Sequence, residues 1–210
     1  MTLSGKGLNK GGTDVRRAIL LVAMMAVSLL VASGVALAVT KIGTDGPDTL
    51  RGTNGDDNLL GKGGNDTLFG LRGSDNLVGG TGKDLMFGGF GDATGSGDDN
   101  LVGGSGNDAV FGAQGSDNIA GGEGNDYLVD GNEPNPKKDA LSAGPGNDVI
   151  FAWNRPAGKD LVVCGSGYDR VAADRLDKVA RDCEKVSVYH RKFPDAFFES
   201  IPESFWEGLP

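Results

Sequence analysis

The sequence has few of the residues from which most enzyme active sites are built. It has one histidine, His190, and two cysteines, and it contains neither an HExxH nor a GxSxG motif. A zinc protease needs several metal ligands at fixed spacing, and a serine hydrolase of this type needs its nucleophile in a strand–turn–helix elbow. No GK[ST] sequence follows the glycine clusters, which excludes a phosphate-binding loop. The sequence therefore predicts a protein that is not an enzyme.

Aromatic residues are also scarce, at 7% of the chain, whereas glycine contributes 37 of the 210 residues. Glycine has the most backbone freedom to lose on folding, so this composition predicts a high entropic cost. Either the chain stays disordered or something beyond an apolar core stabilises it. The formal net charge of -9 argues against a nucleic acid partner and favours a cation.

The amino-terminal segment has the features of an export signal. Residues 18–32 form an apolar run that only Ser28 interrupts, and residues 36–38 read Ala-Leu-Ala, as a signal peptidase site requires. Four basic residues precede the run: Lys6, Lys10, Arg16 and Arg17. We predict a signal helix, cleavage after Ala38, and a secreted, extracellular chain without membrane attachment. The alternative is an uncleaved anchor, although the run is shorter than the roughly 20 residues that span a bilayer.

Cleavage after Ala38 would leave 16 basic and 28 acidic residues, a net charge of -12. Both cysteines, Cys164 and Cys183, lie in the exported part. Because disulfides persist in oxidising compartments, we predict a disulfide between them. The loop that it closes is short, and the chain-entropy model gives a stabilisation of about 3 kcal/mol.

Most of the exported chain consists of a nine-residue repeat. Twelve blocks share a glycine at the fourth position, an aspartate at the sixth and an apolar residue at the eighth. They begin at residues 43, 52, 61, 70, 79, 94, 103, 112, 121, 143, 155 and 164. Residues 88–93 break the register, and a stretch rich in proline and lysine interrupts it over 130–138. A disordered chain has no reason to keep an apolar residue in one phase, so the repeat favours a solenoid over disorder.

The chemistry of one block indicates its structure and its ligand. The last three residues predict a short strand whose middle side chain faces inward, and the first six predict a turn. The aspartate stands where turn and strand meet, so stacked coils place carboxylates in a row along one edge. Carboxylates so close repel one another unless a hard cation lies between them. Calcium takes six to eight oxygen ligands and accepts carboxylates and backbone carbonyls alike.

These blocks resemble the hemolysin-type calcium-binding repeat of the RTX family, GGxGxDx(apolar)x. The best matches are GGSGNDAVF from Gly103 and GGEGNDYLV from Gly121, and the resemblance covers about residues 43–172. It implies an all-β fold, a right-handed parallel β-roll solenoid with two repeats per coil, and Ca2+ in the turns. By resemblance the ligand aspartates are Asp48, Asp57, Asp66, Asp75, Asp84, Asp99, Asp108, Asp117, Asp126 and Asp148. Carbonyl groups of the turn glycines complete each shell, at Gly64, Gly82, Gly104, Gly106, Gly122 and Gly124.

Some blocks depart from the family pattern. Asp160 and Asp169 lie in looser blocks, where a purely structural role is the alternative to calcium binding. The break at 88–93 is either a bulge or a collapsed repeat, and the residues leave both open. The second position is not glycine in several early turns, which predicts weaker binding there: Thr44, Thr53, Lys62 and Leu71.

The predicted organisation is a signal peptide over 1–38, a β-roll over 39–172, and a terminal region over 173–210. That region is expected to form a short cap pinned by the disulfide, followed by a partly ordered tail; a partner-binding tail is the alternative.

The predicted function is that of a secreted calcium-binding protein. An adhesin or surface-associated structural protein with the roll as spacer is the second hypothesis, and a secreted hydrolase that kept only its repeats is the third. The sequence indicates calcium ions as partners and leaves a protein or glycan partner unknown.

Overall fold

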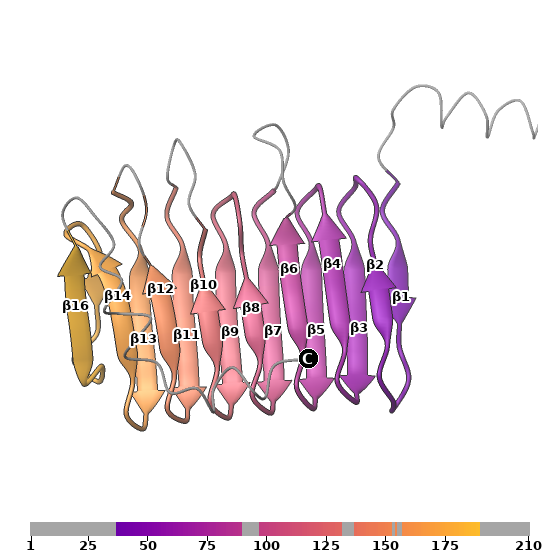
Figure 1. Ribbon diagram of the computed structural model, residues 1–210. Coiled ribbons are helices and arrows are strands. Elements are labelled where there is room, and N and C mark those ends of the chain that lie inside the picture. Colours follow the sequence, from indigo (N-terminus) through magenta and orange to yellow (C-terminus); the bar gives the residue numbers. More distant parts are fainter. Residues whose placement is uncertain (1–36, 90–96, 132–136, 153, 155–156, 190–210) are drawn as a thin grey trace, which may run out of the picture. The chain divides into compact units, whose positions relative to one another are not determined.

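The computed structural model describes residues 37–89, 97–131, 137–152, 154 and 157–189. The predicted signal helix and the tail from residue 190 onward lie outside these ranges. The described residues contain sixteen β-strands and no helix, arranged as two parallel sheets of eight strands (Figure 1). The predicted all-β parallel solenoid is confirmed.

Consecutive strands alternate between the two sheets, so two strands and their turns make one coil. The odd sheet contains β1 (Thr40–Ile42), β3 (Asn58–Gly63), β5 (Asn76–Thr81), β7 (Asn100–Ser105), β9 (Asn118–Glu123), β11 (Ala140–Pro145), β13 (Leu161–Ser166) and β15 (Lys178–Val179). The even sheet contains β2 (Thr49–Arg51), β4 (Thr67–Leu71), β6 (Leu85–Gly89), β8 (Ala109–Phe111), β10 (Tyr127–Val129), β12 (Val149–Ala152), β14 (Arg170–Asp174) and β16 (Lys185–Tyr189).

The turns lie along two edges of the roll. Those that lead from an odd to an even strand lie within the first six residues of a block, over 43–48, 61–66, 79–84, 103–108, 121–126, 143–148 and 164–169; in all but the first of these ranges, the odd strand extends over the first three residues. We call this the short-turn edge. The turns that lead from an even to an odd strand form the long-turn edge, and those after β6, β10 and β12 are enlarged. In Figure 1 the short turns lie along the bottom and the enlarged turns along the top.

The break at residues 88–93 lies mostly outside the described residues, and both a bulge and a collapsed repeat stay open for it. β5 pairs with β7 in register, and the hydrogen bond from the Asp75 backbone to Asp99 spans 24 residues where neighbouring coils span 18. The six extra residues therefore lie in the connection between β6 and β7. Because the strand order is unbroken, the break leaves the pairing of coils unchanged.

The proline- and lysine-rich interruption conceals a repeat that the sequence pattern did not reveal. Leu141 of β11 pairs with Ile119 of β9 and Val162 of β13, so it takes the inward, eighth position of a block. Asp139, two residues earlier, takes the sixth. The block was missed because a longer turn with no glycine in phase precedes it.

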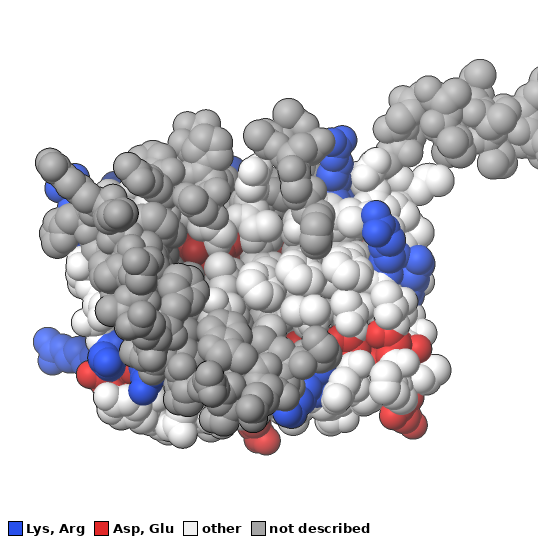
Figure 2. All heavy atoms as spheres, viewed as in Figure 1, with Lys and Arg blue, Asp and Glu red and all other residues white. Residues whose placement is uncertain are grey.

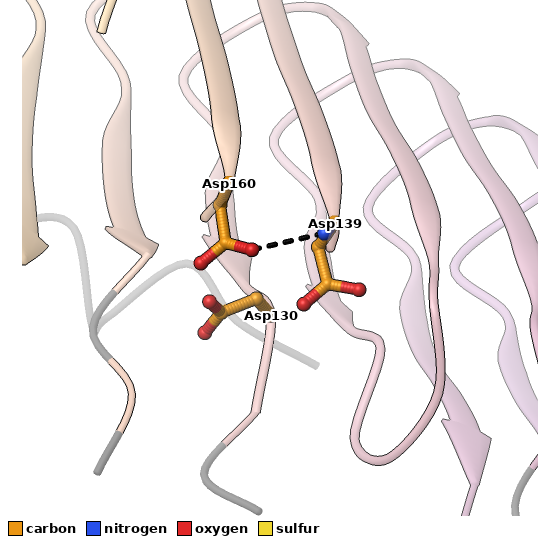
Figure 3. Close-up of side chains that lie close together, drawn as sticks. All are labelled: Asp130, Asp139 and Asp160. Carbon is orange, nitrogen blue, oxygen red and sulfur yellow. Dashed lines mark hydrogen bonds between the residues drawn. The ribbon is translucent and has the colours of Figure 1, made fainter. Parts of the chain in front are cut away.

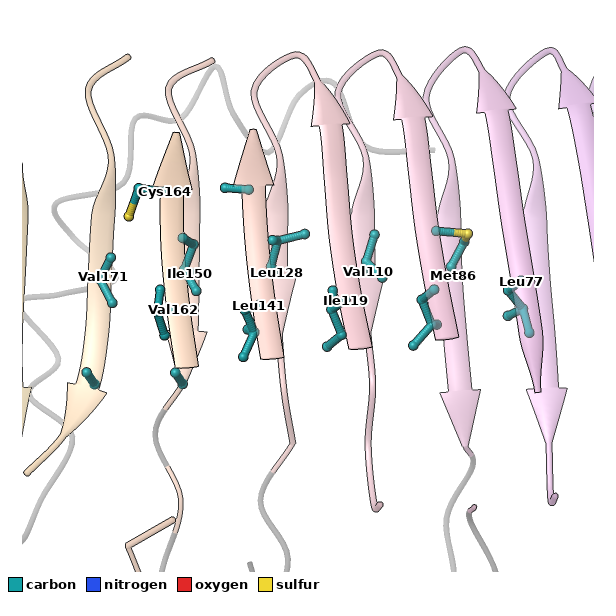
Figure 4. Packing of buried hydrophobic residues seen from close by; sticks show 14 of the residues in the cluster. Leu77, Met86, Val110, Ile119, Leu128, Leu141, Ile150, Val162, Cys164 and Val171 are labelled. Carbon is teal, nitrogen blue, oxygen red and sulfur yellow. The ribbon is translucent and has the colours of Figure 1, made fainter. Parts of the chain in front are cut away.

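One main apolar side chain from each of the strands β2 to β15 packs in the interior (Figure 4). Strand alternation directs the eighth position of each block inward, and stacking in register superimposes these side chains from coil to coil. Leu50 in the first coil is partly buried. The predicted inward residues are otherwise fully buried: Leu59, Leu68, Leu77, Met86, Leu101, Val110, Ile119, Leu128, Ile150, Val162 and Val171.

The coils continue beyond residue 172, where the sequence led us to expect a cap. β15 pairs with β13 and β16 pairs with β14, both in parallel. Cys164 and Cys183 form the predicted disulfide, with a Cα–Cα distance of 5.2 Å. It joins β13 to the turn before β16, and so ties the last coil to its predecessor.

Truncation of one interior side chain is expected to destabilise the roll strongly. Leu101→Ala removes methyl groups from a fully buried position, which costs about 2–5 kcal/mol. The neighbouring Val102 on the same strand faces outward and is half-buried. Val102→Ala is therefore expected to cost less than about 1 kcal/mol. Urea unfolding at fixed, saturating calcium measures both, and equal losses would contradict the assigned orientation of β7.

Candidate metal centre

The sixth-position aspartates form a continuous hydrogen-bonded row along the short-turn edge. Oδ1 of each carboxylate accepts the backbone N–H of the equivalent aspartate one coil earlier. The donor–acceptor distance is 2.8 Å from Asp66 to Asp84, 2.8 Å from Asp84 to Asp108 and 2.9 Å from Asp108 to Asp126. The row continues through Asp148 and Asp169 and ends on Glu184.

A second row runs along the long-turn edge in the same manner. Asp57 donates its backbone N–H to Asp75, and Asp75 donates to Asp99, both at 2.8 Å. The later members, in order, are Asp117, Asp139, Asp160 and Asp177. The loose-block residues Asp160 and Asp169 are therefore full members of the two rows.

The second carboxylate oxygen is the unusual feature of these rows. For most members among the described residues, Oδ2 is buried and has no hydrogen-bond partner. On the short-turn edge this holds for Asp66, Asp84, Asp108, Asp126, Asp148 and Asp169, and on the long-turn edge for Asp75 and Asp99. A buried carboxylate oxygen without a donor is costly, so each such atom calls for a positive partner.

Burial changes the acidity of these groups. It raises the pKa of Asp108 to about 7, and those of Asp126 and Asp99 to about 8. In each case the backbone hydrogen bond opposes the rise, and neighbouring aspartate charges add to it. Without a cation, the rows therefore hold carboxyl groups that resist ionisation near neutral pH.

Backbone oxygens face the same spaces as the orphaned Oδ2 atoms. A Cβ atom built on Gly79, the first residue of its turn, would collide with Asp84 Oδ2 and lie 2.7 Å from the carbonyl oxygen of Gly103 in the next coil. At Gly103, the same atom would lie 2.5 Å from Asp108 Oδ2. Glycine at this position thus leaves a small space, and carboxylate and carbonyl oxygens from neighbouring coils line it.

The six glycines predicted as carbonyl ligands share one conformation. All have positive φ, between 104° and 141°, and the carbonyl oxygen of each points at the equivalent glycine one coil later: Gly64, Gly82, Gly104, Gly106, Gly122 and Gly124. Lys62 and Leu71 adopt positive φ at the second position, as does Ala113. Side chains disfavour this backbone region, so these turns store strain where other turns have glycine.

The two turns with threonine at the second position differ from the rest. The backbone N–H of Thr44 donates to Asp48 Oδ2 at 2.6 Å, and its hydroxyl donates to the same atom at 2.9 Å. Thr53 makes the equivalent hydrogen bonds to Asp57. These backbone and hydroxyl donors hold the pKa of Asp48 below its usual value. In these turns the protein itself satisfies the oxygen that is orphaned elsewhere.

A separate acidic cluster lies at the long-turn edge, where the β10–β11 and β12–β13 connections meet (Figure 3). Oxygens of Asp130, Asp139 and Asp160 lie within 4.8 Å of one another, and all three residues are buried. The Asn154 amide donates to Asp130 Oδ2 at 3.0 Å and to Asp160 Oδ2 at 2.9 Å. Burial and the charges of Asp160 and Asp139 raise the pKa of Asp130 well above its usual value. This cluster has the donor set to hold a metal ion.

The donor set of the rows fits a hard divalent cation. All candidate ligand atoms are carboxylate or carbonyl oxygens, which calcium prefers, and no described histidine or free thiol is present to favour a softer metal. Most of the acidic atoms visible in Figure 2 lie toward the lower side, where the short turns are. A cation there would neutralise carboxylates that the fold buries and stacks.

The comparison with known families decides which cation this is. The model of the RTX calcium-binding nonapeptide repeat matches four times, at residues 42–77, 60–94, 93–128 and 136–171. The chain belongs to this family. Its repeats bind Ca2+, and the family is a calcium-binding repeat rather than a catalytic one. No curated protein matches the chain.

The structure places all ten predicted aspartates in the two rows. Six lie on the short-turn edge: Asp48, Asp66, Asp84, Asp108, Asp126 and Asp148. Asp57, Asp75, Asp99 and Asp117 lie on the long-turn edge. Sequence reasoning missed Asp130, Asp139 and Asp177 and the terminal Glu184. A residual signal was available, since an acid stands two residues before an apolar residue at Asp139, Asp177 and Glu184.

Proposed function

We propose that this RTX protein is a secreted, non-enzymatic solenoid in which calcium ions between neighbouring coils stabilise the roll. One observation supports the proposal above all: the regularly spaced, buried Oδ2 atoms that lack a donor. A fold held by its apolar core alone would not accumulate such atoms. The interior is thin, with one main apolar side chain per strand. Calcium binding would therefore supply a large part of the free energy that stabilises the folded state.

We assign the main calcium row to the short-turn edge. Carboxylates of Asp66, Asp84, Asp108, Asp126 and Asp148 would bind there with the carbonyl groups of the turn glycines. The uniform turns of this edge support this assignment, because they repeat the same oxygen-lined space in successive coils. Asp75, Asp99 and Asp117 would bind calcium on the long-turn edge, where the turns vary in length. Asp48 and Asp57 would bind calcium more weakly, because threonine already donates hydrogen bonds to their Oδ2 atoms.

Two matched variants test the assignment. Asp108→Asn is expected to lower the number of bound calcium ions and to raise the calcium concentration needed for folding, because it removes charge from the middle of the row. Asp48→Asn changes the same chemical group in a turn that Thr44 closes, and is expected to leave the number unchanged. Calorimetry and native mass spectrometry give the count. Equal losses for both variants would contradict the assignment.

Acid is expected to stabilise the calcium-free roll. The folded-state pKa of Asp108 is about 7 and that of Asp126 about 8, whereas the ordinary value is 3.8. The folded state therefore binds more protons than the unfolded state between these values, and stability falls as pH rises through 7 to 8. Circular dichroism of metal-depleted protein should show β-structure increasing from pH 8 to pH 5. The calcium concentration that half-saturates the protein should rise as the pH is lowered from 8 to 5, because protons and calcium compete for the carboxylates. A β-signal independent of pH would contradict this expectation.

Secretion rests on the sequence features of residues 1–38. In the described part of the chain, no helix has the length and apolar character that a membrane span requires. Mass spectrometry of the protein recovered from the medium tests the proposal, with a new amino terminus at Val39 as the expected result. Retention of the intact leader on membranes would favour the anchor instead.

A further inference from the structure

The outward faces of the two sheets differ in character. On the even sheet, five aromatic rings stand in one row across successive strands, with centroid separations of 5.4, 4.9, 5.9 and 5.2 Å. In order they are Phe69, Phe87, Phe111, Tyr127 and Phe151, and we call this row, with the aliphatic side chains beside it, the aromatic face. The interior of the roll lies on the other side of the sheet, since Leu128 points inward between Tyr127 and Val129.

Several side chains of the aromatic face are buried although they point away from the interior. Tyr127 is 7% exposed, Phe151 6% and Val149 3%. The outward side chains of the odd sheet are half-buried, as Val102 is, or exposed, as Asn118 and Ser142 are. The difference is not a property of the repeat, because both sheets are built from the same nine-residue blocks.

Burial of the aromatic face calls for a layer from elsewhere in the chain or from a partner. Every described element is a strand of one of the two sheets, and the odd sheet lies across the interior. Tyr127 of β10 and Phe151 of β12 are buried, whereas Phe69 and Phe87 toward the amino-terminal end are only half-buried. The layer therefore covers the part of the sheet that is nearer to its carboxy-terminal strand, β16.

We propose that the chain's own tail, residues 190–210, packs on the aromatic face. The tail follows directly from β16, the last strand of this sheet. It carries five of the fourteen aromatic residues of the chain, and the row on the sheet carries five more. The tail aromatics are Phe193, Phe197, Phe198, Phe205 and Trp206. A segment rich in aromatic residues thus follows directly in the chain from the sheet that carries the aromatic face.

The tail is long enough to cover the face. Parallel strands are about 4.8 Å apart, so the six steps from β16 to β4 span about 29 Å. Extended chain covers about 3.3 Å per residue, so about nine residues reach β4. The tail has 21 residues, which allows it to cross the sheet with several aromatic contacts. Contact near β16 also costs the least loop entropy, which agrees with the gradient of burial.

Quenching of Trp206 fluorescence tests the proposal. The chain has two tryptophans, so Trp153→Phe leaves Trp206 as the sole emitter. The protein is the chain from Val39 onward, the product of the proposed leader cleavage, saturated with calcium, and acrylamide is the quencher. We expect a quenching constant several-fold below that of a free peptide of residues 190–210. Phe111→Ser with Tyr127→Ser should raise it to the peptide value, whereas Val78→Ser with Val102→Ser on the odd sheet should not change it.

A second variant avoids changes to the roll itself. Phe197→Ser with Phe198→Ser alters only the tail and is expected to expose Trp206 to the same degree. Circular dichroism and the calcium count are measured in each variant, so that failure of the calcium proposal is seen separately from failure of this one. Quenching of Trp206 in the parent at the peptide rate would overturn the proposal. Shielding that rises with protein concentration would also overturn it, because a second copy would then be the occupant.

Discussion

Removal of calcium at pH 8 is expected to unfold the roll, with loss of most of its β-sheet signal in far-ultraviolet circular dichroism. A pH of 8 is at or above the pKa values of Asp84, about 6, Asp108, about 7, and Asp126, about 8, so most of these carboxyl groups would carry charge without a counter-ion. Each coil would then hold charges that are buried, stacked and unneutralised. Neither the thin core nor the single disulfide can compensate for this along the whole row.

A calcium titration measures the reverse reaction. Because the unfolded chain has no preformed site, folding and binding should occur together, with a midpoint of about 10⁻⁴–10⁻³ M, as for other extracellular modules. Magnesium at equal concentration serves as the control, since it demands a smaller octahedral site and gives up water reluctantly. A fully folded spectrum in chelator at pH 8 would contradict calcium-dependent folding.

Gly106→Ala is expected to have the second largest effect, with loss of folding at calcium concentrations that saturate the parent. Gly106 has φ of 141°, which alanine adopts only with strain. Its Cβ would also collide with the carbonyl oxygen of Gly82 in the preceding coil, and that oxygen is backbone that cannot rotate away. The coils would have to separate at the point where a cation is proposed to join them.

The first turn provides a matched control for this substitution. Gly46 has the same fourth position in its block, but a Cβ there meets nothing closer than the Thr44 hydroxyl at 3.9 Å, and its φ lies outside the positive region. Gly46→Ala is therefore expected to change stability by less than about 1 kcal/mol. The calcium midpoint of folding, followed by circular dichroism, compares the two variants. A similar midpoint for both would show that close stacking of the turns is not required.

The nine-residue period predicts the strands and both aspartate rows well, because each block determines its own local structure. A strand needs only its three residues in phase, as Thr67-Leu68-Phe69 shows, and the coil repeats it. The prediction failed where phase was lost. Asp139 and Leu141 were missed because the turn before them contains four extra residues, and no glycine marks the block.

The features that local pattern could not predict depend on contacts between coils. The sequence shows threonine in place of glycine at Thr44 and Thr53, but not that each would satisfy its own aspartate. The acidic cluster depends on Asp130 and Asp160, which are 30 residues apart and meet only when their coils stack. The same applies to β15 and β16, whose blocks have acids and apolar residues in phase but no repeat glycine.

All enlarged turns of the described roll lie on one edge, so the regular spacing of the coils fixes the distances between them. The connections after β6, β10 and β12 hold extra residues while every strand keeps its register. The first two are two coils apart and the last two are one coil apart, which corresponds to separations of about 10 Å and about 5 Å. A foreign peptide spliced into one of these connections would be displayed at a distance set by the number of coils and not by any linker. The opposite edge would keep its uniform turns and the calcium sites proposed there.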